Sequence, residues 1–299
     1  MAYLSKRNPT AGVRFTLTGR DVEMLKTIER FRYIRTGQLH RLHFPKGSTL
    51  QGIRRRLKYL FHNRYVGRVE PFVQIGHGSA ETAYHIGREG VKLLEELGVE
   101  TTYYRKANQV KHQFLHHALD ISEFRVHLEL ALRDHAVVQL HRFTADFELK
   151  ARTDAAVGRR RYKLYDEIVH PVNKQSYTVY PDALIILRGK GEYAKFQKLY
   201  FLEVDRSTEG LRIIQDKVIG YNLYRRENVF KKFGAFDDFQ VLFQAPSQKR
   251  AGNIRQALTD LEGTESVWVT SADQISEDSI LGSAIWTDHT LAPQRLLKS

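Results

Sequence analysis

Leu199-Tyr200-Phe201-Leu202-Glu203-Val204-Asp205 is an apolar run that ends in two acidic residues. An earlier apolar run, residues 183–187, begins directly after Pro181-Asp182. Both runs have the length and composition of buried strands. If they are neighbours in a sheet, Asp182, Glu203 and Asp205 meet at one edge of it. The sequence therefore predicts an α/β fold with an acidic cluster at a sheet edge.

The acidic cluster has a chemical consequence. Three carboxylates at one point repel each other unless a cation lies between them. Their oxygens are hard ligands that suit Mg²⁺ or Mn²⁺. The chain is otherwise basic, with 47 Lys and Arg residues against 34 Asp and Glu and a net charge of +13. The combination indicates metal-dependent chemistry on a phosphodiester.

Composition limits the class of protein. A length of 299 residues suggests about two domains of ~100–200 residues. Nucleic acid is the commonest partner of such a basic chain, although a ribosome-binding protein or one on an anionic membrane would share the charge. The absence of cysteine excludes disulfides and thiolate zinc sites. Without an apolar run of ~18 residues or a signal peptide, we expect a cytoplasmic protein with no membrane partner.

The N-terminal third predicts three helices. Thr18 and Asp21 form a near capping box at the start of the first. The second covers residues 38–44 and ends at Pro45 and Gly47, and the third covers residues 50–63. Strand patterns follow at residues 65–70 and 82–86, with Gly76, Gly78 and Ser79 between them, and a fourth helix covers residues 91–97. This order is typical of a winged helix-turn-helix.

The predicted third helix has a basic face that a DNA groove would accept. We expect Gln51, Arg54, Arg55 and Lys58 to face the major groove or its phosphates. Arg64 and Arg68 would contact the backbone near the wing, and Arg56 points partly inward beside Leu57. The alternative is a winged helix for protein contacts, whose arginines only solvate a face.

The rest of the chain predicts a second domain. A polar linker at residues 101–111 precedes a long helix at residues 112–133. Strands at residues 136–140, 183–187, 198–204, 240–244 and 266–270 alternate with helices at residues 212–226 and 251–261. His112, His116 and Asp120 share one face of the long helix, which we interpret as the polar side of an amphipathic helix because the glutamate of a protease motif is absent.

This order of elements resembles the common core of PD-(D/E)xK nucleases. The resemblance implies that Asp182 and Glu203 bind Mg²⁺. The family usually has a lysine two residues after the glutamate, and here Asp205 replaces it. Lys217, on the following helix, is a candidate for a migrated lysine, and Tyr221, one turn further on, could contact a phosphate. The alternative is that Asp182 opens a strand and Asp205 caps the next helix.

Several segments in order resemble the replication-relaxation family of plasmid and conjugative-element proteins. They are residues 17–21, 36–44, 55–60, 84–90, 117–121, 181–183 and 201–209, followed by Lys217 and Tyr221. The resemblance covers roughly residues 14–286. It implies a role in plasmid replication or in relaxing DNA at a transfer origin.

Together these observations predict an α+β/α/β chain in five parts. They are a basic arm (1–15), a winged helix (16–100), a linker (101–111), a restriction-endonuclease-like mixed-sheet domain (112–288) and a tail (289–299). We expect a site-directed nickase or endonuclease acting on double-stranded DNA. Its catalytic residues would be Asp182, Glu203, Asp205 and Lys217. A homodimer and plasmid replication or transfer proteins are further expected partners. The alternative is a non-catalytic DNA-binding initiator or transcriptional regulator.

Overall fold

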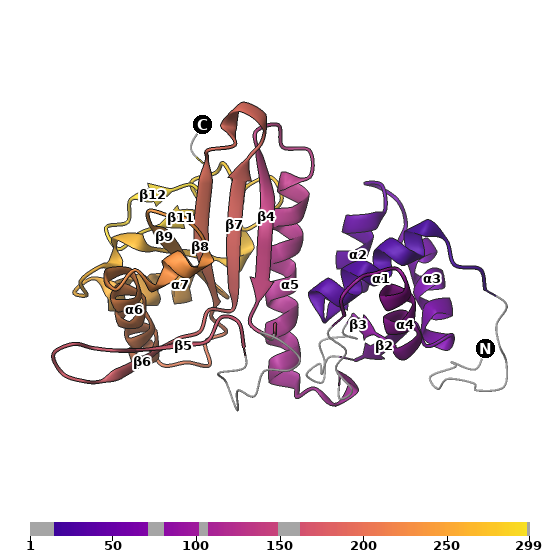
Figure 1. Cartoon of the computed structure of the whole chain (residues 1–299), viewed down its shortest axis with the longest axis horizontal. Helices are drawn as coiled ribbons and strands as arrows, with labels where there is room; N and C mark the ends of the chain where they lie inside the picture. The colour runs from indigo at the N-terminus through magenta and orange to yellow at the C-terminus, as the bar shows by residue number, and fades with distance from the viewer. Residues whose placement is uncertain (1–14, 71–80, 102–106, 149–161, 298–299) are drawn as a thin grey trace. The chain divides into compact units, whose positions relative to one another are not determined.

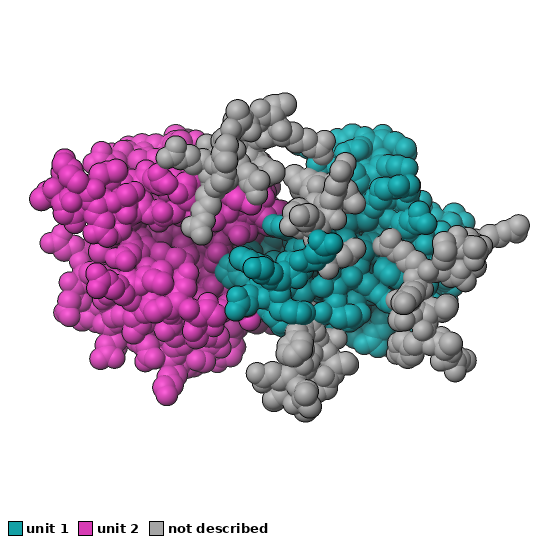
Figure 2. Space-filling model, turned by 90° about the horizontal axis from the view of Figure 1, so that it is seen from below, with its two compact units in different colours: residues 1–126 teal, residues 127–299 magenta. Residues whose placement is uncertain are grey.

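The computed structural model describes residues 15–70, 81–101, 107–148 and 162–297 (Figure 1). The basic arm up to residue 14, the glycine turn at residues 76–79 and residues 102–106 of the linker therefore lie outside the described residues. The chain is a mixed α/β protein that divides into two compact units, residues 1–126 and 127–299 (Figure 2). Helix α5, His112–Leu132, contributes residues to both units.

The first unit is built from short helices and a small sheet. Its elements are α1 (Gly19–Phe31), β1 (Ile34–Arg35), α2 (Thr36–His43), α3 (Leu50–His62), β2 (Val66–Val69), β3 (Ala83–Ile86) and α4 (Arg88–Glu96), then the 3₁₀ turn η1 (Ala107–Gln109). The sheet order is β1-β3-β2, and both pairings are antiparallel. Gly98, with a φ of 74°, follows the end of α4 in the left-handed region that glycine favours.

Helix α1 begins where its sequence predicts. The Asp21 N–H donates to Thr18 Oγ1 at 3.3 Å, and the Thr18 N–H donates to Asp21 Oδ2 at 2.7 Å, which completes the capping box. Arg56 of α3 donates from Nε to Asp21 Oδ1 at 2.9 Å and from Nη2 to Oδ2. Asp21 therefore completes the capping box of α1 and ties α1 to α3, and Arg56 points partly inward, as its position beside Leu57 predicts.

The first part of α5 packs into the first unit. The Ser122 hydroxyl donates to the Tyr33 carbonyl at 2.8 Å, and Gln38 Nε2 donates to Glu123 Oε2 at 2.7 Å. Arg41 of α2 also donates to Glu123. The Arg125 guanidinium lies 4.6 Å from the centre of the Phe31 ring. These contacts explain why the compact unit extends to residue 126.

The second unit is organised by a mixed sheet of seven strands among the described residues. Their order is β12-β11-β10-β9-β8-β7-β4. The strands are β4 (Val138–Ala145), β7 (Ala183–Gly189), β8 (Gln197–Val204), β9 (Phe239–Ala245), β10 (Val267–Ser271), β11 (Trp286–Thr287) and β12 (Pro293–Gln294). β7 runs antiparallel to β4 and β8, whereas β8, β9 and β10 are parallel. β11 and β12 add antiparallel pairs.

Two helices and a hairpin complete this unit. They are α6 (Leu211–Arg226), α7 (Gln248–Leu258) and the pair β5 (Asp166–Val169) and β6 (Ser176–Val179), which form a separate two-stranded sheet. Short 3₁₀ turns lie at Gly191–Tyr193, Val229–Phe233, Thr264–Ser266 and Ala272–Gln274. Tyr224 of α6 donates to Asp166 Oδ2 at 2.8 Å and so holds the hairpin against the helix.

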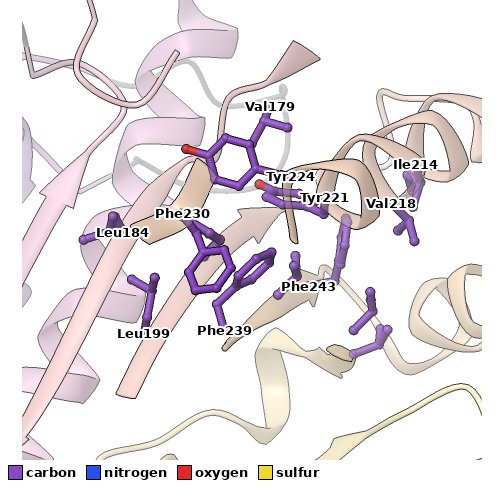
Figure 3. Packing of buried hydrophobic residues seen from close by; sticks show 14 of the residues in the cluster. Val179, Leu184, Leu199, Ile214, Val218, Tyr221, Tyr224, Phe230, Phe239 and Phe243 are labelled. Atoms are coloured by element: carbon purple, nitrogen blue, oxygen red, sulfur yellow. The ribbon is translucent and has the colours of Figure 1, made fainter. Parts of the chain in front are cut away.

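The core of the second unit is rich in aromatic residues. Tyr221 and Tyr224 of α6 lie in one buried cluster with Phe230 and Phe239 (Figure 3). The Phe201 ring of β8 is at the centre of this group, 4.9 Å from the Phe239 ring and 5.6 Å from the Tyr221 ring. Close aromatic packing fixes α6 over the sheet. It thereby sets which α6 side chains reach the end of β8.

The element bounds confirm most of the predicted helices and strands. The structure differs at β4, which covers Val138–Ala145, whereas the sequence predicts a strand at residues 136–140. A register shift between Leu140 and Arg142 explains the difference, because it places polar residues inside a strand without ending it. The sequence did not predict β1, β5, β6, β11 or β12.

Candidate functional site

The predicted acidic residues lie where β7 begins and β8 ends. Ala183 and Leu202 are register partners in the antiparallel pair, so Asp182 and Glu203 are the next residues on the two strands. The Asp182 N–H donates to the Leu202 carbonyl at 2.9 Å, and Asp182 Oδ2 accepts from the Val204 N–H at 2.6 Å. Asp182 is therefore fixed against the end of β8. The structure brings these two carboxylates together as predicted.

Glu203 is buried, with 2% of its surface exposed. Its two oxygens accept from two residues of α6. Lys217 Nζ donates to Oε2 at 3.0 Å, and the Tyr221 hydroxyl donates to Oε1 at 2.5 Å. Lys217 and Tyr221 are four residues apart, so they lie on the same side of the helix. Lys217, on the predicted helix after β8, therefore contacts Glu203, as the hypothesis of a migrated lysine requires.

The electrostatics of this group follow from burial. Burial raises the pKa of the Glu203 carboxyl, Lys217 opposes this rise, and the charge of Asp182 adds to it. Burial lowers the pKa of Lys217, but Glu203, Asp182 and Glu209 outweigh burial and leave this pKa above its ordinary value. Burial raises the pKa of Tyr221 well above its ordinary value, and the charge of Glu203 raises this pKa as well. Lys217 is therefore a permanent cation at neutral pH.

Asp205 has a different partner. Arg250 of α7 donates from Nε to Asp205 Oδ2 at 2.7 Å and from Nη2 to Oδ1 at 3.0 Å. The Asp205 N–H donates to the Gln244 carbonyl at the end of β9, at 2.9 Å. The Asp205 side chain is 3% exposed and that of Arg250 is 14% exposed. This is a bidentate, largely buried ion pair.

Glu209 links the two pairs. Its carboxylate accepts from Lys217, with 2.9 Å between Nζ and Oε2, and its carbonyl accepts from Arg250 Nη2 at 2.7 Å. The cluster thus holds four carboxylates, those of Asp182, Glu203, Asp205 and Glu209, against two cations, Lys217 and Arg250. At full ionisation, four against two leaves two negative charges in excess.

Neither Glu209 nor Arg250 was predicted from the sequence as a site residue. A signal for Arg250 exists in the order of elements. β8 and β9 are parallel, so the helix that follows β9 begins beside the residue that follows β8. Glu209 follows Asp205 within the segment 201–209, but nothing in its spacing indicates a contact with Lys217 on the next helix.

Two further predictions concern Tyr221 and the metal site. Tyr221 is 2% exposed, and its hydroxyl is directed at Glu203 inside the unit. Among the described residues, no group of three or more His, Asp or Glu side chains is arranged to hold a metal ion. Metal binding by Asp182, Glu203 and Asp205 stays a prediction.

The basic residues expected on the third helix lie on its outer face. Gln51, Arg54, Arg55 and Lys58 of α3 are exposed, as is Arg64, while Ile53, Leu57 and Leu60 are buried on the opposite face. Within the described ranges, Arg54, Arg55 and Lys58 have no ion-pair partner. Arg68 of β2 is half-buried, with its guanidinium 4.3 Å from the centre of the Phe61 ring. Contact of these residues with DNA stays a prediction.

One comparison with known proteins identifies relatives. A family model described as Replication-relaxation matches residues 25–238, more than half of the chain. This range runs from within α1 to beyond the end of α6 and includes both Asp182 and Lys217. The chain has no significant match among curated proteins or among solved structures. None of the helices in the described part of the chain is long and apolar enough to cross a membrane.

Proposed function

The chain belongs to the replication-relaxation family, and we propose that it binds DNA of a plasmid or mobile element and cuts one strand with a divalent cation. The family suggests a role in plasmid replication or mobilisation. The observation that carries the proposal is the contact of Lys217 with Glu203 beside Asp182. A lysine that touches one of two adjacent carboxylates can assist phosphodiester cleavage, because it supplies positive charge where the phosphate becomes more negative.

The first unit supports the DNA-binding half of the proposal. Its order of elements, with α2 and α3 followed by the β2–β3 pair, is the order of a winged helix-turn-helix. The exposed face of α3 carries Arg54, Arg55 and Lys58. Positive side chains on the outward face of a recognition helix neutralise phosphates or contact base edges. We assign these residues, with Gln51, to the major groove, and Arg64 and Arg68 to the flanking backbone.

The acidic pair suits Mg²⁺ or Mn²⁺ in its donor chemistry. Mg²⁺ is commonly held by one or two carboxylates together with water and substrate phosphates. Asp182 and Glu203 offer two carboxylates, and the cluster has negative charge in excess. The Arg250 guanidinium occupies both oxygens of Asp205, whereas Glu203 faces one cation, Lys217, and the neutral hydroxyl of Tyr221, so we assign the cation to Asp182 and Glu203 first. When bound, the cation would polarise the phosphate and lower the pKa of a bound water.

The chain's own residues have separate tasks in this proposal. Lys217 lies 28% exposed between the buried Glu203 and solvent, where it can contact a phosphate oxygen. Tyr221 holds the Glu203 carboxylate in one orientation through its hydroxyl. Asp205 and Arg250 fix the turn that leads from β8 into α6. Tyr221 and Arg250 are positioning residues, since neither is placed to touch the phosphate.

Incubation of a supercoiled plasmid with the full chain tests the proposal. We expect open circles in Mg²⁺ or Mn²⁺ and none in EDTA. Asp182→Ala and Glu203→Ala should abolish nicking but keep DNA affinity, which a gel shift measures in parallel. Asp216→Ala, on α6 but without a contact to Glu203, is the matched control and should nick as the parent does. Absence of nicking by the folded parent with every divalent metal tried would refute the cutting activity.

A non-catalytic DNA-binding protein is the second candidate. The observation that favours it is that protein cations already pair with two of the carboxylates. Arg250 forms an ion pair with Asp205, and Lys217 forms one with Glu203. In that case the second unit would keep the cluster as a structural ion-pair network. Binding that persists in Asp182→Ala and Glu203→Ala, with no nicking by the parent, would select this alternative.

A further inference from the structure

We propose that Lys217 is the base of a phosphate-binding site and that the Glu209 carboxylate occupies this site until a phosphate replaces it. The inference rests on the proposed function, because the ligand is a DNA phosphodiester. It goes further by naming the group that blocks the site in the absence of DNA.

The two contacts of Lys217 differ in how readily they can be exchanged. Glu203 is buried on β8, and its side chain is 3% exposed. The Glu209 side chain is 38% exposed and belongs to the connection between β8 and α6. An anion from solution can therefore displace Glu209 but not Glu203. A ligand can therefore reach Lys217 from its exposed side, where Glu209 lies.

The connection that carries Glu209 is fixed at its backbone. Arg250 Nη2 donates to the Glu209 carbonyl at 2.7 Å, while the same guanidinium is held by Asp205. Only the Glu209 side chain must rotate to release Lys217, so no loop has to refold. Exchange of one carboxylate for one phosphodiester conserves the charge that Lys217 faces, because each carries one negative charge. The exchange therefore costs little free energy, and the site favours anions that make additional contacts of their own.

Removal of the Glu209 charge tests the inference. Glu209→Gln keeps the size of the side chain and an oxygen acceptor, so the fold should be unaffected. Glu227→Gln is the matched control, because it removes one charge from the other end of α6, where Glu227 is exposed. The readout is the side-chain nitrogen resonance of Lys217 in ¹⁵N-lysine-labelled full chain, followed during titration with inorganic phosphate in EDTA. A second titration uses a single-stranded oligonucleotide without terminal phosphates.

We expect the phosphate concentration that half-shifts the Lys217 resonance to fall about fivefold in Glu209→Gln, the size of a partly exposed ion pair. Glu227→Gln should match the parent. The oligonucleotide should behave as phosphate does if the site takes phosphodiesters. If only free phosphate responds, the assignment to DNA is overturned. Equal titrations of Glu209→Gln and parent, or an equal gain in Glu227→Gln, would overturn the role of Glu209. Because no metal is present, these outcomes are independent of whether the chain nicks DNA.

Discussion

Arg250 donates hydrogen bonds to both carboxylate oxygens of Asp205, from Nε to Oδ2 at 2.7 Å and from Nη2 to Oδ1 at 3.0 Å. The pair joins the residue after β8 to the first turn of α7 and, through the Glu209 carbonyl, to the start of α6. The nuclease pattern predicted from the sequence has a lysine at the position of Asp205, and in the structure a lysine of α6 contacts Glu203. The ion pair therefore explains how an acid can occupy this position without leaving an unpaired charge in the interior.

Loss of either member of this pair should destabilise the second unit. Asp205→Ala and Arg250→Ala each leave one buried charge without its partner, which costs about 3 kcal/mol of unfolding free energy. The double variant should lose much less than the two losses added together, since neither charge is then stranded. Urea unfolding of the four proteins measures this. Additive losses would show that the pair contributes nothing as a pair.

Tyr221→Phe should separate the effect of the hydroxyl on the orientation of Glu203 from the packing of the aromatic ring. The ring keeps its place beside Phe201, but Glu203 loses a hydrogen bond, so stability should fall by about 1–2 kcal/mol and nicking should slow. Tyr224→Phe is the matched control because its hydroxyl bonds Asp166, away from the cluster. It should cost similar stability and leave nicking unchanged. Equal nicking by the two variants would remove the positioning role of Tyr221.

Arg54→Ala and Arg55→Ala should weaken DNA binding through the phosphate backbone. Each lost phosphate contact reduces the slope of log affinity against log salt by about 0.9. Fluorescence anisotropy with a labelled duplex at several salt concentrations measures both the affinity and the slope. Arg88→Ala changes an exposed residue of α4 in the same unit and should bind like the parent. A slope that stays constant in the α3 variants would place the DNA surface elsewhere.

Acid should destabilise the first unit through Asp21. Burial raises the pKa of Asp21, but hydrogen bonds from Arg56 and Thr18 outweigh it and leave the pKa below the ordinary value of 3.8. Because the folded pKa is depressed, the stabilisation is complete above about pH 4–5 and is lost as pH falls through the folded pKa. Asp21→Asn should remove this pH dependence.

At neutral pH, Asp21→Asn should cost about 3 kcal/mol, since it weakens both a cap and a buried ion pair. Glu23→Gln, on the same helix, removes an exposed pair with Lys26 and should cost less than about 0.5 kcal/mol. Thermal unfolding between pH 3 and pH 7 compares them. Parallel pH profiles for the parent and Asp21→Asn would contradict the assignment.

Local signals predicted much of this fold. Thr18 and Asp21 are three residues apart and lie at the start of a helix, so the sequence alone identifies the cap. The apolar runs that became β7 and β8 are equally local, and their acidic ends predicted that Asp182 and Glu203 meet. The hairpin β5–β6 was missed because its four-residue strands alternate buried and exposed side chains among charged residues, without a long apolar run.

The partners of the acidic residues were harder to predict. Arg250 is separated from Asp205 by a helix and a strand, and only the parallel order of β8 and β9 brings them together. Lys217 was found because it follows β8 within one element. Tyr221 was expected at a phosphate, yet its hydroxyl lies on Glu203, since the aromatic core around Phe201 holds the ring inward. Tertiary packing, which sequence spacing does not record, decided these contacts.

We propose that Asp182 and Glu203 together hold one divalent cation. Titration of the full chain with Mn²⁺, followed by the electron paramagnetic resonance signal of the free ion, tests it directly. We predict one bound Mn²⁺ that is lost in Asp182→Asn and in Glu203→Gln and retained in Asp216→Asn. Equal Mn²⁺ binding by all four proteins, or none by the parent, would contradict the claim.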